Sequence, residues 1–305
     1  MRARLKLLQK KTLNLFRTKK MRDLDNLLEK FNNYLSSLLE YDNSPQHKVI
    51  DSMKYSLFSG GKRIRPLLSL ITFCEFSEDS LDKILPFAAA IEMIHTYSLI
   101  HDDLPAMDDD DFRREKPTNH KVYSEGIAIL AGDGLLNMSM EILLRHIENI
   151  EDPEDLKRAM RAMKYIYNAT GVNGMIGGQT IDISRDVADY TEDDCENMYK
   201  LKTGALIKAS VVVGGIIAGL DPDNITKLAR FGESIGIAYQ FEDDLLDEEK
   251  DPDSGEINML LFKDKEDLQN EIIDLTNGAY EALDGLELKE DALKNFAAKL
   301  VNRSR

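Results

Sequence analysis

Two groups of aspartates carry the clearest chemical signal in the sequence. Asp102, Asp103 and Asp108 lie in the string DDLPAMD, and Asp243, Asp244 and Asp247 lie in the string DDLLD. Carboxylates this close in an apolar setting repel one another far more strongly than the ~1 kcal/mol of repulsion felt in water, so a cation is expected between them. Magnesium prefers oxygen ligands and is usually held by one or two carboxylates together with substrate phosphates. The pattern therefore predicts a phosphate group bound through magnesium.

The residues around each group predict the element that positions it. The segment Ile91–Ile100 has a helical period and Pro105 cannot continue it, so the first group is expected at a helix C-terminus, where the helix dipole favours a bound cation. Asp243 and Asp247 stand four apart on one face of a second helix, with Gln240 one turn earlier. A solvated acidic surface is the alternative interpretation of either group.

Cations gather in three short strings of this acidic chain. The string GGKRIRP, Gly60–Pro66, combines a flexible turn with three cations just before a helix, and Arg offers a planar fork for phosphate oxygens. Arg113-Arg114 and Lys202-Thr203-Gly204 add cations elsewhere. His95 shares the helix face of Asp102, although a lone histidine on a helix is more often structural. Together these strings predict a diphosphate site that needs no metal, with an ordinary basic surface turn as the alternative.

The composition argues against several classes of protein. The chain has 305 residues, a formal net charge of −16 and two cysteines, Cys74 and Cys195. Nucleic-acid binding depends on clustered Lys and Arg, so no nucleic-acid partner is expected. Two solitary cysteines predict a reducing compartment without a disulfide framework, and we expect a cytoplasmic protein.

The N-terminal segment differs from the rest of the chain. Met1–Lys20 holds eight Lys or Arg residues and no Asp or Glu. We interpret residues 1–20 as a flexible basic extension and residues 21–305 as a single helical domain. An organellar targeting peptide is the alternative, because such peptides are rich in Arg and poor in acid. No uninterrupted apolar run reaches the ~18 residues of a membrane span, so none is predicted.

Helical periodicity dominates the chain and predicts an all-α fold. Apolar residues recur at three- and four-residue spacing, whereas alternating strand-like runs are nearly absent. The helices predicted from this spacing cover Leu24–Leu39, Leu81–Leu99, Ile127–Ile147 and Leu268–Leu283. Asp152, Thr191 and Asp221 each precede acidic or Pro residues in a first turn, so they are predicted to cap helices.

Seven strings, in order, resemble those of the trans-isoprenyl diphosphate synthases, the family of farnesyl and geranylgeranyl diphosphate synthases. The strings are GGKRIRP, HTYSLIHDDLPAMDDDDFRR, KPTNH, AGD, GGQ, KTG and YQFEDDLLD, and they run from about Lys54 to Asp247. The resemblance implies a single large helical bundle around a central cavity, with the two acidic groups on facing helices. It also implies a magnesium-dependent prenyltransferase that assembles as a homodimer.

The resemblance assigns roles to residues that match the family motifs. Together with the allylic diphosphate, about three Mg²⁺ ions per site would be held by Asp102, Asp103, Asp108, Asp243, Asp244 and Asp247. Arg113, Lys202 and Gln179 would contact the allylic diphosphate, and Gly61, Lys62, Arg65, His95 and Arg114 would hold isopentenyl diphosphate. Thr203 and Gln240 would line the reaction centre, where they would act with Asp102, Asp103, Asp108, Lys202 and Asp243.

Two features bear on product and rate. Tyr97 lies about 7.5 Å before Asp102 along a helix axis, where its ring and the neighbouring Ser98 should limit chain growth. This resembles the bacterial farnesyl synthases. Family members usually carry a longer, lysine-containing loop after the second acidic group, whereas here Lys250 is the lysine near Asp247. Weaker closure over the allylic diphosphate is therefore expected.

Two classes of function remain open. The first is a prenyltransferase that makes farnesyl diphosphate from isopentenyl and dimethylallyl or geranyl diphosphate, with a geranylgeranyl diphosphate synthase as its close alternative. The second is a low-activity or non-catalytic diphosphate-binding paralogue, which the altered loop favours. A terpene cyclase is disfavoured, because a cyclase needs no isopentenyl site and would have no use for GGKRIRP.

Overall fold

The structure is a computed structural model that describes residues 20–40, 46–184, 189–248 and 257–301. Side chains are described from Leu24 onward and, within the helix that ends at Glu248, as far as Leu246. The predicted basic extension lies outside the described residues except for Lys20, where the first labelled helix begins. Lys250 and the surrounding loop lie outside them too, and so does the side chain of Asp247.

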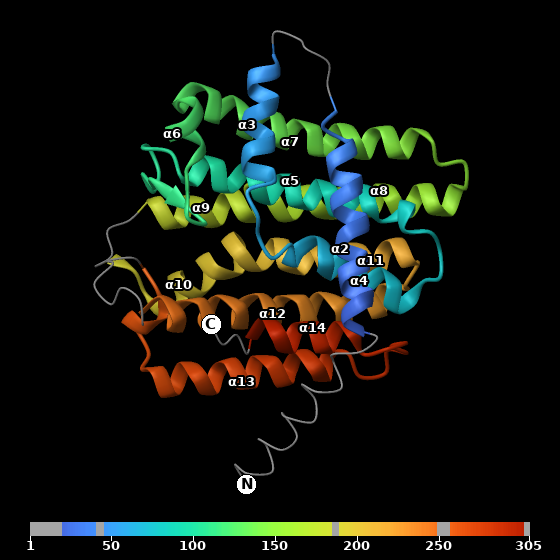
Figure 1. Cartoon of the computed structure of the whole chain (residues 1–305). Coiled ribbons are helices and arrows are strands. Elements are labelled where there is room, and N and C mark those ends of the chain that lie inside the picture. Colours follow the sequence, from blue (N-terminus) through green and yellow to red (C-terminus); the bar gives the residue numbers. More distant parts are fainter. Residues whose placement is uncertain (1–19, 41–45, 185–188, 249–256, 302–305) are drawn as a thin grey trace.

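Helices make up nearly all of the described elements (Figure 1). The first half contains α2 (Lys20–Ser37), α3 (His47–Leu57), α4 (Ile64–Phe76), the 3-10 turn η1 (Leu81–Lys83), α5 (Leu85–Asp102), α6 (Asn119–Tyr123) and α7 (Glu125–Glu148). The second half contains α8 (Pro153–Thr170), α9 (Met175–Ile183), α10 (Glu192–Tyr199), the π-helical turn η3 (Lys200–Gly204), α11 (Ala205–Ala218), α12 (Pro222–Glu248), η4 (Met259–Leu261), α13 (Lys265–Ala282) and α14 (Ala292–Val301). A short antiparallel pair, β1 (Phe112–Arg113) and β2 (Lys116–Pro117), follows the first acidic group. The all-α prediction is confirmed.

Each helix predicted from apolar spacing is present with ends shifted by a few residues. The four segments correspond to α2, η1 with α5, α7 and α13. The predicted caps are also confirmed: Asp152 accepts hydrogen bonds from the backbone of Glu154 and Asp155, Thr191 forms a capping box with Asp194, and Asp221 accepts from Asn224 N at 2.9 Å. Side-chain capping satisfies backbone N–H groups that a helix start leaves free.

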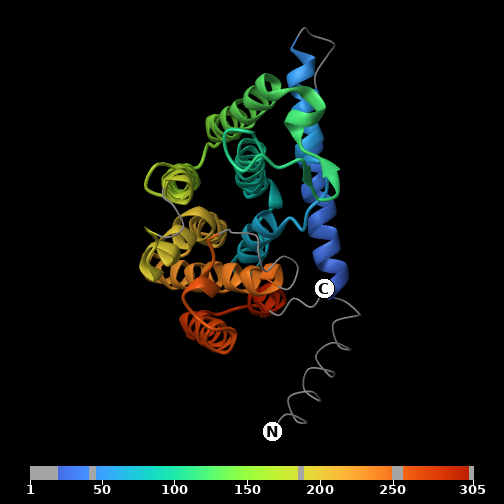
Figure 2. The same ribbon diagram turned by 90° about the vertical axis from the view of Figure 1, so that its left-hand side faces the viewer.

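The helices stack in layers around α5 and α11. In Figure 1, α7, α5, α11, α12 and α13 run roughly parallel across the molecule, one below another. Helices α2 and α3 cross these layers along one side, as Figure 2 shows after a quarter turn. Helix α5 is buried on nearly every side up to Ile94, which is the environment expected for a helix that is apolar all round. This packing fixes the direction of its last turn, where the first acidic group lies.

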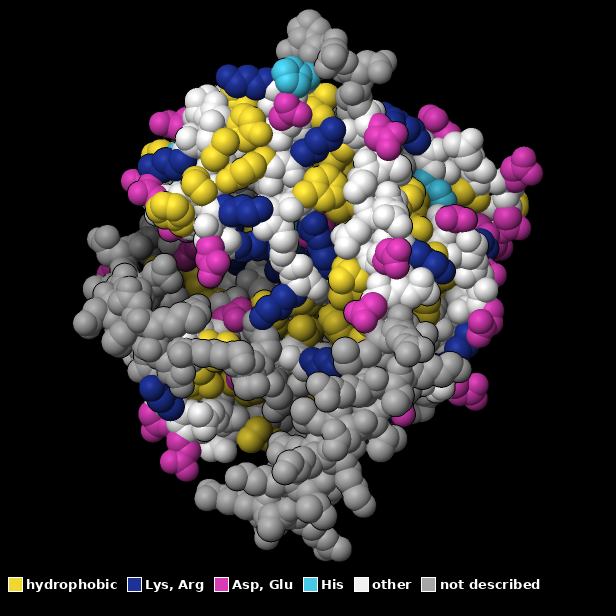
Figure 3. Space-filling view, in the orientation of Figure 1, with side chains coloured by type: hydrophobic (Ala, Val, Ile, Leu, Met, Phe, Trp, Pro, Cys, Tyr) yellow, Lys and Arg dark blue, Asp and Glu magenta, His cyan; other side chains and the backbone are white. Residues whose placement is uncertain are grey.

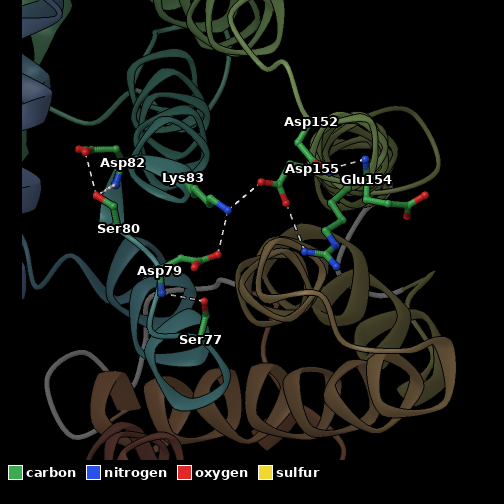
Figure 4. Close-up of polar contacts among 9 residues, drawn as sticks. Ser77, Asp79, Ser80, Asp82, Lys83, Asp152, Glu154 and Asp155 are labelled. Carbon is green, nitrogen blue, oxygen red and sulfur yellow. Dashed lines mark hydrogen bonds and ion pairs between the residues drawn. The ribbon is translucent and has the colours of Figure 1, made fainter.

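A polar network joins η1, which directly precedes α5, to α8, near the end of α5 opposite its acidic group (Figure 4). Lys83 Nζ donates to Asp79 Oδ2 at 2.8 Å and to Asp155 Oδ2 at 2.7 Å, and Arg158 Nη1 donates to Asp155 Oδ1 at 3.2 Å. These side chains are partly or largely exposed, so the pairs contribute little to stability. Apolar packing around α5 and α11 is therefore the main source of stability in this part.

By length and composition alone, two helical stretches of the described chain could cross a membrane, namely Glu125–Glu148 and Glu192–Ala218. Of the second stretch's apolar window 72% is buried inside the protein, which identifies it as a core helix of this fold. The first stretch is α7, whose window is 44% buried. The sequence analysis predicted no membrane span because it considered only uninterrupted apolar runs. Polar residues and glycines interrupt both of these stretches.

Candidate active site

The first acidic group ends α5 as predicted. Asp102 is the last residue of the helix and Asp103 follows it, while Asp108 N donates to Asp102 O at 2.9 Å and turns the loop back onto the helix end. Burial raises the pKa of Asp102 to about 6, opposed by Lys202 and assisted by the Asp108 carboxylate. Burial also raises the pKa of Asp108. These carboxylates are held where negative charge is unfavourable unless a cation joins them.

Asp103 has a protein partner already. Its side chain is buried, and Arg113 Nε donates to Asp103 Oδ1 at 2.5 Å, while Arg113 Nη2 lies 3.2 Å from Asp110 Oδ2. Burial raises the pKa of Asp103 and Arg113 lowers it. The structure therefore pairs a predicted metal ligand, Asp103, with a predicted diphosphate ligand, Arg113.

The second acidic group lies on α12, and its members differ in environment. Asp244 is 5% exposed; its Oδ2 accepts from Tyr199 OH at 2.8 Å and from Met259 N at 2.9 Å. Burial raises the pKa of Asp244 to about 6, and these hydrogen bonds lower it. Burial lowers the pKa of Arg65 on α4, and the Asp243 carboxylate is among the groups that oppose this shift, so Asp243 and Arg65 interact electrostatically. Asp244 thus supports the fold beside Asp243, a role that the sequence analysis missed.

The π-helical turn η3 connects the two acidic groups. Lys202 lines a cavity together with Asp102, and its ammonium group partly offsets the burial that raises the pKa of Asp102 and of Asp108. The next residue, Thr203, donates to Gln240 Oε1 at 3.0 Å, one turn before Asp244 on α12. Thr203 and Gln240, two of the predicted residues of the reaction centre, are therefore brought together beside the cavity that Thr203 and Lys202 line. Single π turns are frequent at functional sites.

Helix α9 packs its backbone directly against η3. A Cβ atom on Gly178 would lie 2.2 Å from Lys202 N, so only glycine allows this approach. The neighbouring Gln179 has both side-chain amide atoms buried without a hydrogen-bond partner among the described residues. Lys202 Nζ donates to Asp182 Oδ2 at 2.5 Å. The unpartnered amide of Gln179, next to a paired lysine, fits a polar ligand at this position.

The GGKRIRP turn forms one wall of a basic cavity of about 430 Å³. Gly61 has φ of +114°, and a Cβ atom there would lie 2.6 Å from Arg114 Nη1, so the Arg114 guanidinium lies across this glycine. Arg114 also donates to Gly60 O. The lining includes Gly61, Lys62, Arg63, Arg65, Glu92, His95, Arg114 and Tyr239. Figure 3 shows Lys and Arg side chains around the hollow at the centre of this face.

His95 and Arg65 stand between this basic cavity and a second, more apolar one. Arg65 Nη1 lies 3.3 Å from His95 Nε2, and both residues line both cavities. Burial and the surrounding guanidinium groups, first that of Arg65 and then that of Arg114, hold the pKa of His95 well below 6.5. His95 is therefore a neutral imidazole at neutral pH.

The second cavity, of about 440 Å³, extends from Asp102 and Lys202 into apolar surroundings. Tyr97, Ser98, Leu136, Met175, Ile176 and Ile183 are among its lining residues. Tyr97 is largely buried, and its ring packs edge-on against His101 with centroids 5.8 Å apart. Both predicted chain-length residues, Tyr97 and Ser98, thus border a cavity that begins at the first acidic group.

The described side chains contain no cluster of three or more His, Cys, Asp or Glu residues arranged to hold a metal ion on their own. The donor set still fits magnesium, because Asp102 and Asp108 are oxygen donors held together at a cost that a cation would relieve. Magnesium is usually completed by substrate phosphates and water rather than by an all-protein cage. The side chain of Asp247 is outside the described part, so its predicted role stays a prediction.

This arrangement of helices and cavities is shared with known proteins of one fold class. The crystal structure of a geranyltransferase from Legionella pneumophila matches 93% of this chain and 97% of its own, with a TM-score of 0.82 and 32% sequence identity. The fold is therefore the all-α fold of that prenyltransferase. The family model for polyprenyl synthetase matches residues 46–269, and the chain belongs to this family.

Two relatives in this family differ in the product that their names give. Farnesyl diphosphate synthase of Bacillus subtilis (strain 168) is 44% identical over 196 residues, 64% of this chain and 65% of the relative. Geranylgeranyl diphosphate synthase of Cyanophora paradoxa is also 44% identical, over 200 residues, 65% of each chain. The matched part of the chain thus spans slightly less than two thirds of each relative's length.

Proposed function

We propose that this protein is a magnesium-dependent short-chain trans-prenyltransferase that condenses isopentenyl diphosphate with an allylic diphosphate. The observation that carries the proposal is the pair of adjoining cavities that share Arg65 and His95. One cavity is basic, as an anionic substrate requires, and the other leads from Asp102 and Lys202 into an apolar chamber. A prenyl chain with a diphosphate at its head fits the second cavity, and a short diphosphate fits the first.

The chain's own residues can bind and orient both substrates. Lys62, Arg65 and Arg114 would hold the isopentenyl diphosphate, and Lys202 and Gln179 would contact the allylic diphosphate. Asp102, Asp103, Asp108, Asp243 and Asp244 are the described carboxylates that would hold Mg²⁺, although Asp103 also pairs with Arg113 and Asp244 also accepts a hydrogen bond from Met259 N. When bound, Mg²⁺ supplies positive charge that stabilises the departing diphosphate.

The proposed reaction breaks one bond and forms another. The allylic carbon–oxygen bond breaks, and diphosphate leaves with the electron pair toward Lys202 and the first acidic group. The isopentenyl double bond then attacks the allylic carbon, and the proton released from the new chain passes to the departed diphosphate. Apolar walls that include Leu136, Met175 and Ile176 exclude water that would otherwise capture the carbocation.

We propose farnesyl diphosphate as the product. Tyr97 supports this, because its buried ring borders the chamber close to Asp102 and would stop a growing chain early. The name of the Bacillus subtilis relative agrees with this product, and that of the Cyanophora paradoxa relative gives the next longer one. Incubation with isopentenyl diphosphate, Mg²⁺ and dimethylallyl, geranyl or farnesyl diphosphate, followed by chromatography, tests both proposals. No elongation from any primer would instead support a non-catalytic diphosphate-binding protein.

We further propose that the protein forms a homodimer in the cytoplasm. The outer face of α7 exposes apolar side chains that a second copy would cover, namely Ile129, Leu130, Met140 and Leu144, each between 38% and 51% exposed. Exposed apolar stripes of this kind are typical of interaction surfaces. Light scattering on the purified protein should give twice the 34.6 kDa mass of the chain. Leu130→Glu on this face should shift the mass toward that of the monomer.

A further inference from the structure

The basic cavity contains one arginine that the sequence analysis left without a role and one buried carboxylate. Arg63 is 8% exposed and Glu92 is 3% exposed. Arg63 Nη1 donates to Glu92 Oε1, and Arg63 Nη2 donates to Leu57 O at 2.5 Å. The pair thus ties the GGKRIRP turn to α5 and to the end of α3.

A buried carboxylate such as Glu92 is unexpected in a cavity that is proposed to bind an anion. Its Oε2 atom is buried and has no hydrogen-bond partner among the described residues, and the cavity that it lines is otherwise cationic. A carboxylate oxygen repels a diphosphate, so direct binding of the substrate cannot explain its position. Its effect on Arg63 can explain it.

The Arg63–Glu92 pair holds an uncommon backbone conformation in place at Arg63. Arg63 has φ of +49° at the N-cap of α4, a left-handed conformation that is uncommon for residues other than glycine. Lys62 precedes this residue and Arg65 follows it by two positions, and both line the basic cavity. The direction of both cations therefore depends on the conformation that Glu92 fixes through Arg63.

The pair also sets the charge of the cavity. Glu92 neutralises Arg63, and His95 is neutral because its pKa lies well below 6.5. Lys62, Arg65 and Arg114 then remain as the charged groups of the lining. Their three positive charges equal the negative charge of a fully ionised diphosphate monoester.

We propose that Glu92 is a positioning residue for the isopentenyl diphosphate pocket, which it shapes by holding Arg63 in the left-handed turn between Lys62 and Arg65. This inference rests on the proposed function. It assigns to Glu92 no contact with the reacting atoms. Its effect should therefore appear in the affinity for one substrate and leave the other substrate's affinity nearly unchanged.

The test compares Glu92→Gln, which removes the charge but keeps the shape, with the double variant Arg63→Met/Glu92→Leu. Buried ion pairs can often be replaced by apolar residues without loss of stability, so the double variant separates positioning from folding. We expect both variants to raise the KM for isopentenyl diphosphate about tenfold, because small misplacements of binding groups are costly. The KM for the allylic substrate should change less than about twofold. Glu233→Gln, which breaks an exposed pair with Lys208, is the matched control.

A double variant that folds normally with wild-type KM for isopentenyl diphosphate would overturn the inference, because the pair would then serve stability alone. Equal increases in both KM values would overturn it too. If the wild-type protein fails to elongate any primer, the proposed function fails. In that case, calorimetric titration of the same proteins with isopentenyl diphosphate tests the role of Glu92, and a tenfold weaker affinity in the variants is expected. Thermal unfolding measures the stability of each variant.

Discussion

The basic cavity differs in its charge balance from the entrance of the apolar second cavity, where Asp102 and Lys202 lie. In the basic cavity, protein groups fix the cations: Glu92 holds Arg63, Gly60 O accepts from Arg114, and His95 lies beside Arg65. At the entrance, burial raises the pKa of Asp102 to about 6, and its charge is only partly balanced by Lys202. The first site is complete as an anion receptor, whereas the second needs added positive charge. Under the proposed function, the basic cavity would hold one diphosphate directly and the entrance would hold the other through metal.

The largest expected effect comes from removing a carboxylate at the entrance. Asp102→Asn should lower kcat by about 10²- to 10³-fold, because it removes a group that would hold the charge stabilising the departing diphosphate. Its effect on the KM for isopentenyl diphosphate should be small. Steady-state kinetics with both substrates measures this, with Asp111→Asn as the control, since Asp111 pairs with Lys121 at the surface. A variant of Asp102 with wild-type kcat would remove the entrance from the proposed site.

The second-largest effect should come from removing magnesium, which should weaken ligand binding in one cavity far more than in the other. Chelation should weaken binding of a non-reactive allylic diphosphate analogue on the order of a hundredfold, because its charge would then face uncompensated carboxylates. Binding of isopentenyl diphosphate should change less than about threefold, because its cavity holds its own cations. Isothermal titration with and without chelator gives both constants. Equal losses for the two ligands would show that the cavities do not differ in the way described.

The chamber beyond the entrance should control product rather than rate. Tyr97→Ala removes the buried ring and should add one isoprene unit to the main product, while kcat changes by less than about tenfold. Chromatography of the products from dimethylallyl diphosphate detects the shift. The exchange Tyr165→Ala serves as a control for the loss of a partly buried tyrosine elsewhere. Unchanged product length would identify Tyr97 as a packing residue.

The smallest effect concerns the pH dependence of stability. The folded-state pKa of His95 lies well below 6.5, so between pH 8 and pH 5.5 the unfolded chain takes up a proton at this histidine and the folded protein does not. Stability is therefore present above pH 6.5 and declines as the pH falls. His95→Gln should reduce the fall in Tm across this range by about 2 to 4 °C. Calorimetry at both pH values measures it, with the exposed His47→Gln as control; an unchanged fall would contradict the prediction.

Local patterns were enough to predict the helices and the position of the first acidic group at a helix end. Apolar spacing gave α5 and α7, and Pro105 with the periodic run before it placed Asp102 at a helix end. The family motifs assigned Thr203 and Gln240 to one reaction centre, and in the structure these two side chains share a hydrogen bond. These features depend on residues close in sequence or on a motif whose geometry is shared.

The roles of Glu92 and Asp244 could not be predicted in this way, because each depends on a partner that only tertiary packing supplies. Arg63 lies 29 positions from Glu92, and Tyr199 lies 45 positions from Asp244. A weak signal did exist for Glu92, which is the charged residue within the apolar first turns of α5. Asp244 looked like its neighbour Asp243, and a helix turns adjacent residues in different directions.

The hydrogen bond from Met259 N to Asp244 has a consequence for how this chain can vary in evolution. Glu248 is the last residue of α12, and Met259 donates to Asp244 one turn earlier on that helix, so the chain is anchored at both residues to a single rigid element. Insertions or deletions between these anchors need not displace Asp243 or the helices that follow. Since doubling the length of a connection adds only about 0.6 kcal/mol of closure entropy, a change of chain length between these anchors should cost the fold little and leave the chemistry beside them intact.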